Sequence, residues 1–166
     1  SMGRPLPGIE TRIVEHELQI KVTTSPTFFS RYLDGSRFDG EWWPTGDLVE
    51  EDADGFLYHQ GRNDDMITSS GYRIGPAEVE SALLGHPDVA EAAAIAAPDP
   101  ERGSVVKAVV VLRSGTPGPE LVRELQQHCR DVTAPYKYPR IVEFAYELPK
   151  TSSGKIKRSE LRSRQD

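Results

Sequence analysis

The sequence has a single cysteine, no long apolar run and fewer basic than acidic residues, and each shortage excludes a class of protein. One cysteine, Cys129, cannot build a disulfide framework or a cysteine-rich zinc site within one chain. A reducing compartment is therefore expected, and we assign the protein to the cytoplasm. No stretch approaches about 18 consecutive apolar residues, so no membrane span is predicted. The net charge of -6 argues against a general nucleic-acid binder.

The chain has 166 residues and begins Ser1-Met2-Gly3, without the features of a signal peptide. A serine ahead of a methionine is typical of a residue left by an expression tag, so residues 1–2 carry no argument here. The length fits one ordinary domain, or a small domain joined to a piece of another.

Residues 3–64 predict a β-rich region that is incomplete by itself. Residues 9–14 and 18–22 alternate apolar with polar side chains, which is the period of half-buried strands. Residues 41–49 indicate a short strand that ends in a turn, and the Asp-Gly turn at 52–55 leads into a return strand. Two adjacent tryptophans with little to cover them indicate the end of a larger domain, which we place at residues 1–64.

After Asp64 the pattern changes to alternating helices and strands. Residues 75–85 predict a helix, because Pro76 suits its first position and Gly85 its end. Residues 104–112 predict a strand buried on both faces. The further expected elements are a strand at 89–97, a helix from about 116 to 131, a strand at 140–147 and a helix at 159–163. This order predicts an α+β domain over residues 65–166, with a three-stranded sheet covered by helices.

Thr45-Gly46-Asp47 and Arg62 form the first motif with chemical potential. A carboxylate at a strand end can accept two hydrogen bonds from a ribose diol, or it can simply cap a turn. Arg62 follows one hairpin later, so it is expected beside Asp47 as a ligand-binding partner or as a surface ion pair.

Two further motifs carry a cation near small residues. Arg73 follows Ser69-Ser70-Gly71-Tyr72, where small residues let the backbone approach a ligand and arginine can bind phosphate as a fork. Lys155 follows Ser153-Gly154, but Pro149 stands where a Walker loop requires glycine. A mobile lysine there can neutralise charge on a reacting carboxylate and phosphate, or it can belong to a solvated basic tail.

The remaining reactive residue types indicate no site. The four histidines have no ligand spacing, and no metal site is predicted. Cys129 falls on the apolar face of a helix, where a buried small hydrophobe is expected rather than a nucleophile.

In combination, these motifs resemble the acyl-adenylate-forming enzymes, which include acyl-CoA synthetases, luciferases and the adenylation domains of peptide synthetases. The likeness runs from about Arg4 to Arg162. Residues 69–80, 97–103 and 124–140 are most similar to medium-chain acyl-CoA synthetases, with benzoate-type CoA ligases as close relatives.

The resemblance implies a two-step reaction on a carboxylic acid. The acid attacks ATP to give acyl-AMP, and CoA then displaces AMP to give a thioester. Between the steps a small C-terminal domain, here residues 65–166, rotates about a hinge at Asp64. Family members are several times longer, so Mg²⁺ and the acid pocket would be held by an N-terminal domain outside this sequence, and the fragment alone is expected to be inactive.

The resemblance also implies roles for single residues. Lys155 would be the catalytic lysine of adenylation, and Asp47, Arg62 and Arg73 would bind the ATP or AMP nucleotide. The positions implied to bind CoA are Ser70, Gly71, Tyr72, Arg102, Arg130, Tyr138, Pro139 and Arg140. One departure is the segment from Ile13 to Leu18, which is shorter than usual for the family.

Two other functions stay open. The chain could belong to an adenylating enzyme that loads a carrier protein, although Arg102 and residues 138–140 favour CoA. It could instead be a non-catalytic module that binds CoA or a nucleotide. Acetylation of Lys155 by an acetyltransferase, reversed by a deacetylase, would remove its charge and block the first step.

Overall fold

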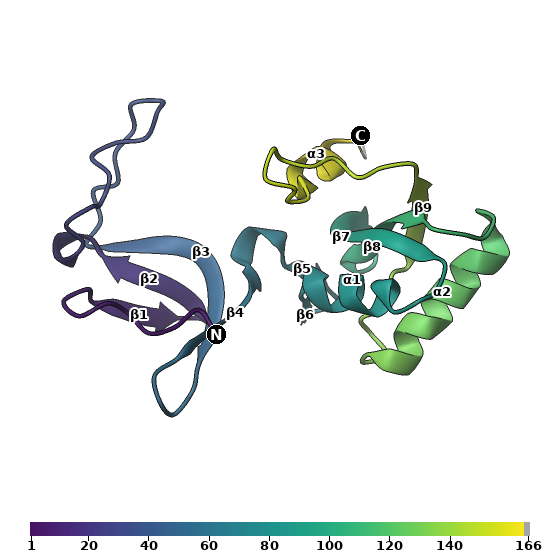
Figure 1. Ribbon diagram of the computed structural model, residues 1–166, viewed down its shortest axis with the longest axis horizontal. Helices are drawn as coiled ribbons and strands as arrows, with labels where there is room; N and C mark the ends of the chain where they lie inside the picture. The colour runs from purple at the N-terminus through teal and green to yellow at the C-terminus, as the bar shows by residue number, and fades with distance from the viewer. Residues whose placement is uncertain (165–166) are drawn as a thin grey trace. The chain divides into compact units, whose positions relative to one another are not determined.

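A four-stranded antiparallel sheet forms the first part of the chain. The computed structural model describes residues 1–164, and Figure 1 draws this sheet in purple and blue. The strands are paired in sequence order: β1 (Thr11–Val14), β2 (Glu17–Lys21), β3 (Trp42–Glu51) and β4 (Leu57–Arg62). The first two confirm the alternating pattern. Glu15 and His16 join them at φ of 50° and 69°, the twist that a two-residue hairpin turn favours.

Strand β3 is longer and less regular than expected. The prediction that Thr45-Gly46-Asp47 lies at a strand end is wrong, because β3 continues through these residues to Glu51. Between the pairs Gln19–Pro44 and Glu17–Leu48 the register advances two steps along β2 and four along β3. The motif therefore occupies a bulge inside the strand, and a bulge re-aims side chains out of the regular alternation.

The first sheet buries little. Its core is Leu18, Val49 and Leu57, with Ile13 packed against them. Aromatic rings of the segment between β2 and β3, which includes a short 3₁₀ turn at Val22–Thr24, form a separate group with one ring from the start of β3. That group consists of Phe28, Phe29, Tyr32, Phe38 and Trp43.

The rest of the chain is built on a three-stranded sheet with helices, which confirms the α+β prediction. A 3₁₀ turn at Asn63–Asp65 leads into it. Its elements are β5 (Ile67–Ser69), β6 (Tyr72–Ile74), α1 (Pro76–Leu84), β7 (Val89–Asp99), β8 (Gly103–Leu112), α2 (Pro119–Val132), β9 (Ile141–Ala145) and α3 (Arg158–Ser163). In this sheet β8 is central, antiparallel to β7 and parallel to β9. The β5–β6 hairpin was not expected from the sequence.

Alternate residues of the central strands serve two different cores. Ala92 and Ala94 of β7 join a core with α1 and α2, whereas Ala93 and Ile95 join a second core with Leu161 of α3. This period of two follows from the pleat of a strand. The sheet is thus buried on both faces, as predicted, with α1 and α2 on one side and α3 on the other (Figure 1).

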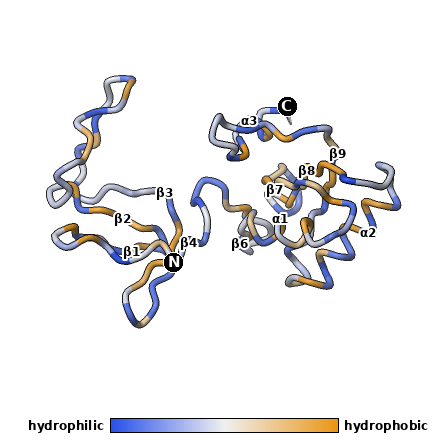
Figure 2. The backbone as a smooth tube through the Cα atoms, in the orientation of Figure 1, coloured by the Kyte–Doolittle hydropathy of each residue, from blue (hydrophilic) through white to orange (hydrophobic). Residues whose placement is uncertain are grey.

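The two long helices begin and end where their sequences indicate. Pro76 and Pro119 occupy the first helical positions, and Gly85 follows the last turn of α1. The buried residues Val79, Ala82 and Leu83 form the predicted stripe of α1. Figure 2 shows hydrophobic and hydrophilic residues alternating along α2, whose Leu125 and Cys129 are completely buried.

The chain divides into two compact units, Ser1–Asp64 and Asp65–Asp166. We call them the first and the second unit. A rotation about Asp64, and the membership of the first unit in a larger N-terminal domain, stay predictions. None of the helices within residues 1–164 is long and apolar enough to cross a membrane.

Candidate functional site

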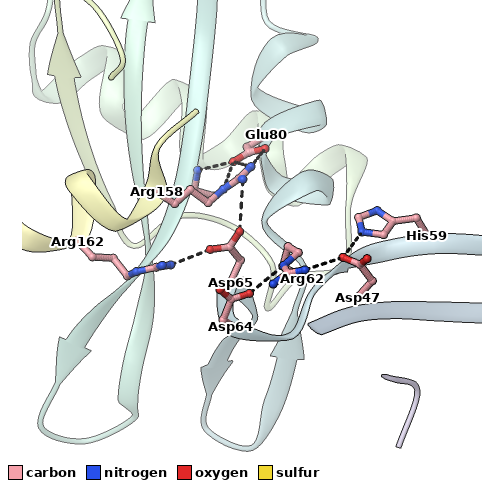
Figure 3. A network of polar contacts seen from close by, with 9 residues as sticks. Asp47, His59, Arg62, Asp64, Asp65, Glu80, Arg158 and Arg162 are labelled. Carbon is pink, nitrogen blue, oxygen red and sulfur yellow. Dashed lines mark hydrogen bonds and ion pairs between the residues drawn. The ribbon is translucent and has the colours of Figure 1, made fainter. Parts of the chain in front are cut away.

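Asp47 and Arg62 meet across strands β3 and β4 (Figure 3). They are opposite in register, and Arg62 Nη1 donates a hydrogen bond to Asp47 Oδ1 at 3.0 Å. The same nitrogen donates to Thr45 O at 2.8 Å, and Arg62 Nε donates to Asp64 Oδ1 at 3.2 Å. The bond with Asp47 raises the pKa of Arg62. The structure thus joins the two residues that were expected to meet, and Asp47 Oδ2 takes no part in these contacts.

Gly46 allows Arg62 to approach the bulge. Its φ is +77°, and a Cβ at this position would lie 2.6 Å from Arg62 Nη2. Glycine alone meets both conditions without strain. Beside it, Thr45 Oγ1 donates to Leu18 O at 2.8 Å and accepts from Asp47 N at 3.1 Å. Threonine and glycine therefore hold the backbone that presents the Asp47 carboxylate.

His59 also lies at this carboxylate, which the sequence did not indicate. Its Nε2 is 3.5 Å from Asp47 Oδ1, as Figure 3 shows. His59 and Arg62 are three residues apart and would face opposite sides of a regular strand. Between the pairs Leu48–Gly61 and Val49–His59, β4 contains one residue more than β3. This extra residue in β4 brings the side chains of His59 and Arg62 to the same face of the sheet. A one-residue slip of this kind leaves no signature in the sequence.

The predicted loop around Ser70 and Gly71 is the turn of the β5–β6 hairpin. These two residues have φ of 48° and 83°. Ser70 N donates to Arg102 O at 3.2 Å, and Arg102 Nη1 donates back to Ser70 Oγ at 3.2 Å. Tyr72 is 53% exposed and stacks on Tyr136 with the ring centroids 4.3 Å apart. Four of the expected CoA positions therefore gather at one exposed turn.

A second group of the residues expected to bind CoA surrounds Tyr138. The guanidinium carbons of Arg130 and Arg140 lie 3.8 Å and 5.1 Å from the centre of its ring. Stacked arginines keep their charge available to a phosphate while their planes cover the aromatic ring. Pro139 between them is buried, so its side chain faces the interior. Arg73 lies on β6 opposite Thr68 and is exposed.

Lys155 lies on a tight loop with a closed stem. Lys150 and Ile156 form an antiparallel bridge, and Thr151 N donates to Lys155 O at 2.8 Å. Thr151 Oγ1 accepts from Lys155 N at 3.1 Å. Gly154 precedes the lysine at a φ of +82°. The backbone of the loop is thus ordered, while the Lys155 side chain is exposed.

An ion-pair network in the second unit was missed by the sequence analysis (Figure 3). Arg158 of α3 binds both carboxylate oxygens of Glu80 on α1, at 2.7 and 2.8 Å. Asp65 contacts the same arginine at 3.5 Å and accepts from Arg162 at 2.8 Å. The partners are 78 and 97 residues apart in sequence, so no local pattern could have indicated them.

The residues expected to be inactive occupy structural positions. Cys129 is completely buried, and burial raises its pKa to about 11. His86 is 5% exposed and packs edge-to-face on His128. Within residues 1–164 no group of three or more His, Cys, Asp or Glu side chains could hold a metal ion.

Comparison with known proteins shows which proteins this chain is similar to. The family model for the AMP-binding enzyme C-terminal domain matches residues 78–155. The human mitochondrial acyl-coenzyme A synthetase ACSM5 is 48% identical over 99% of this chain and 32% of its own length. An uncharacterised acyl-CoA ligase of Bacillus subtilis, YtcI, is 43% identical over 100% of this chain and 34% of its own.

A solved structure agrees with these relatives. The anthranilate CoA ligase AuaEII, crystallised with anthranoyl-AMP, is similar with a TM-score of 0.78 and 38% identity. The similarity covers 99% of this chain and 34% of that one. The chain therefore spans about a third of the length of the proteins it matches. The alignment with the human enzyme extends over 186 residues, so that relative carries residues within the aligned region that this 166-residue chain lacks.

Proposed function

The chain belongs to the AMP-binding enzymes and contains their C-terminal domain, and on this premise we propose that it is the C-terminal part of an ATP-dependent acid–CoA ligase. In the first step a carboxylate oxygen attacks the α-phosphorus of ATP, and pyrophosphate leaves with the electron pair of the broken bond. In the second step the CoA thiolate attacks the acyl carbon, and AMP leaves. The observation that carries the proposal is the family match, which ends at the exposed Lys155.

Lys155 serves the first step. Attack of a carboxylate on a phosphate brings two anions together, and an ammonium group between them lowers the barrier only if it can reach the reacting oxygens. A lysine on a compact Gly-Ser loop provides such a mobile point charge. The exposure of its side chain and the closed stem of its loop both support this role.

Asp47, Arg62 and Arg73 bind the nucleotide in this proposal. A carboxylate accepts hydrogen bonds from both hydroxyls of a ribose, and Asp47 retains Oδ2 for this purpose beside the oxygen held by Arg62. Arg62 orients the carboxylate and adds a positive charge near the α-phosphate. Arg73 supplies a forked donor for a phosphate oxygen.

The second step uses another surface of the second unit. Ser70, Gly71 and Tyr72 would line the passage of the pantetheine arm, because a turn with a glycine admits a narrow chain. The arginines 102, 130 and 140, with Tyr138, would meet the CoA nucleotide, whereas the buried side chain of Pro139 would support this surface from inside. The presentation of different residues in the two steps requires the second unit to rotate, and Asp64 at the unit boundary is the proposed hinge.

The acid, Mg²⁺ and most of the ATP site lie outside this chain. We expect a medium-chain fatty acid or an aromatic acid, in keeping with the names of the relatives and the solved neighbour. The fragment alone should form no acyl-AMP. We place the enzyme in a reducing compartment such as the cytoplasm, although the human relative is named as mitochondrial. Acetylation of Lys155 is proposed to switch off the first step alone.

The test is acid-dependent pyrophosphate release by an enzyme that carries this chain as its C-terminal part. Octanoate and benzoate are compared with and without CoA. Turnover that requires CoA and yields AMP and a thioester supports the ligase. Pyrophosphate exchange that CoA does not carry forward points to a carrier-protein acceptor and overturns the CoA assignments. Binding of CoA without any turnover points to a non-catalytic module.

A further inference from the structure

The loop that carries Lys155 runs directly into α3, a helix too short to hold itself in place. α3 has six residues, and isolated helices shorter than about 12 residues are marginal in water. Leu161 anchors it in a small core with Leu148 and Ile95. One leucine fixes where the helix sits but leaves its rotation about that contact open, so the orientation of the lysine loop must be set by other contacts.

Those contacts are ion pairs made by both ends of α3. Arg158, its first residue, binds Glu80 of α1 with Nη2 at 2.7 Å from Oε1 and 2.8 Å from Oε2. Arg158 Nη1 lies 3.5 Å from Asp65 Oδ2, and Arg162 Nη1 donates to Asp65 Oδ1 at 2.8 Å. We call these four residues the α3 clamp; Figure 3 shows both arginines pointing at the two acids.

The α3 clamp is shielded from water, unlike an ordinary surface pair. The side chains of Glu80 and Asp65 are 12% and 15% exposed, whereas that of Asp64 is 66% exposed. Glu80 Oε1 also accepts a hydrogen bond from Ala94 N of β7 at 2.9 Å. Shielded carboxylates are costly without their partners. The clamp is therefore expected to keep one geometry. The charged groups of an exposed ion pair, in contrast, separate easily because water solvates each of them.

One of the clamped acids stands at the unit boundary. Asp65 is the first residue of the second unit and follows the proposed hinge, Asp64. Arg158 is three residues after Lys155. The clamp thus connects the start of the second unit to the end of the lysine loop by a path of two side chains, although 90 residues of chain separate Asp65 from Lys155.

We propose that the α3 clamp positions Lys155 for adenylation by tying its loop rigidly to the residue that follows the hinge. Arg158, Arg162, Asp65 and Glu80 are positioning residues, because they act through the lysine and do not touch substrate. This inference rests on the proposed function and adds the part of the chain that aims its lysine. Thioester formation does not use Lys155, so loss of the clamp affects the first step selectively.

The experiment separates the two half-reactions in the full-length enzyme. Adenylation is followed as pyrophosphate release with octanoate or benzoate, and thioester formation is followed from the preformed acyl-AMP. Arg162→Ala should slow adenylation by about tenfold to a hundredfold, since misplacing a catalytic group by about 1 Å costs up to that much. Thioester formation should change by less than about twofold. Arg162→Lys, which keeps one donor for Asp65, should restore part of the rate.

Arg164→Ala is the matched control. Arg164 follows the same helix and pairs with Glu160, but its side chain is 60% exposed, so its removal should leave both half-reactions unchanged. Thermal unfolding of each variant checks that the fold persists. In a Lys155→Ala background, Arg162→Ala should slow adenylation no further, because the clamp acts only through the lysine.

The outcomes distinguish the clamp from the underlying function. If Lys155→Ala leaves adenylation intact, the proposed role of Lys155 fails, and the clamp proposal fails with it. If Lys155→Ala strongly slows adenylation but Arg162→Ala slows both half-reactions equally, or neither, the positioning role is overturned while the ligase assignment stands. An additional loss from Arg162→Ala in the Lys155→Ala background would also overturn it.

Discussion

The two units differ in how they bury their apolar side chains. The second unit sandwiches its sheet between two cores, so that Ala93, Val106 and Val110 have almost no exposed surface. The described part of the first unit has four buried apolar side chains, Leu18, Leu48, Val49 and Leu57, on a four-stranded sheet, and Leu33 is fully exposed. The stability of small domains follows buried apolar area. The second unit is therefore expected to be the more stable of the two.

Spectroscopy can observe the units separately. Both tryptophans, Trp42 and Trp43, lie in the first unit, and the three α-helices found within residues 1–164 lie in the second. Tryptophan fluorescence therefore reports unfolding of the first unit, and helical circular dichroism reports unfolding of the second.

The largest effect is expected from Leu125→Ala. Leu125 is completely buried on α2, and truncation of such a leucine costs about 2–5 kcal/mol of unfolding free energy. The dichroism transition should move to lower denaturant, while the fluorescence transition stays in place. Leu84→Ala is the control, because Leu84 of α1 is 49% exposed. Its effect on the free energy of unfolding should stay within about 0.5 kcal/mol. A shift of both transitions together would show that the units unfold as one.

Alkaline pH should weaken the second unit through Cys129. Burial raises its pKa from 9.0 to about 11. The thiol of the unfolded chain loses its proton at lower pH than the buried thiol does. The contribution of the protonated thiol to the free energy of unfolding is therefore complete below pH 9 and is lost as the pH rises towards 11. A shift of this size corresponds to about 2–3 kcal/mol. Dichroism-detected unfolding of Cys129→Ala should have a smaller loss over this pH range than the unchanged chain. Equal slopes would contradict the prediction.

Gly46→Ala tests the bulge of the first unit. A side chain at positive φ costs about 1–3 kcal/mol, and here the new Cβ also meets Arg62 at 2.6 Å. Gly35→Ala is a matched control, because its φ is +87° but nothing lies within 4 Å of its Cβ. The fluorescence transition should fall further for Gly46→Ala than for Gly35→Ala. Identical shifts would mean that the approach of Arg62 adds nothing to the requirement for glycine.

The smallest effect is expected from acid acting on Asp52 of the first unit. Hydrogen bonds from Phe56 N, and from the Tyr58 hydroxyl and Asp54 N, hold the pKa of Asp52 below its ordinary 3.8. This stabilisation is present when the pH is above the ordinary pKa of Asp52. It is lost as the pH falls through the lower pKa that Asp52 has in the folded chain. Asp52→Asn should flatten the acid dependence of the fluorescence transition. Asp54→Asn in the same turn should leave it unchanged, and a similar flattening there would refute the assignment.

The sequence indicated the second unit better than the first because its signals are local. Pro76, Gly85 and the stripe of Val79 lie within a few residues of one another, and each acts through its own helix. The bulge at Thr45-Gly46-Asp47 depends on how β3 aligns with β2, more than twenty residues away. That alignment is set by pairing in three dimensions, so the motif was predicted at the end of its strand and lies inside it.

The same distinction applies to the candidate site. The Asp47–Arg62 contact was predictable because a single hairpin joins the two residues. The Glu80–Arg158 pair was not, because a glutamate on a helix surface has many possible partners and burial selects one of them. The approach of His59 to Asp47 depends on one extra residue in β4, which no composition or spacing reveals.

The parallel pairing of β9 with β8 sets an order of assembly. β7 and β8 are joined by a short turn, so their pairing closes only a small loop and is expected early. β9 pairs with β8 across a connection that contains α2, so this pairing closes a longer loop and is expected later. The Lys155 loop and α3 follow β9 in the chain, and we expect them to dock after it. Destabilising substitutions near the β7–β8 turn should therefore slow folding, and those in α3 should mainly speed unfolding. The lysine is therefore expected to be carried by a segment that docks late and is released early.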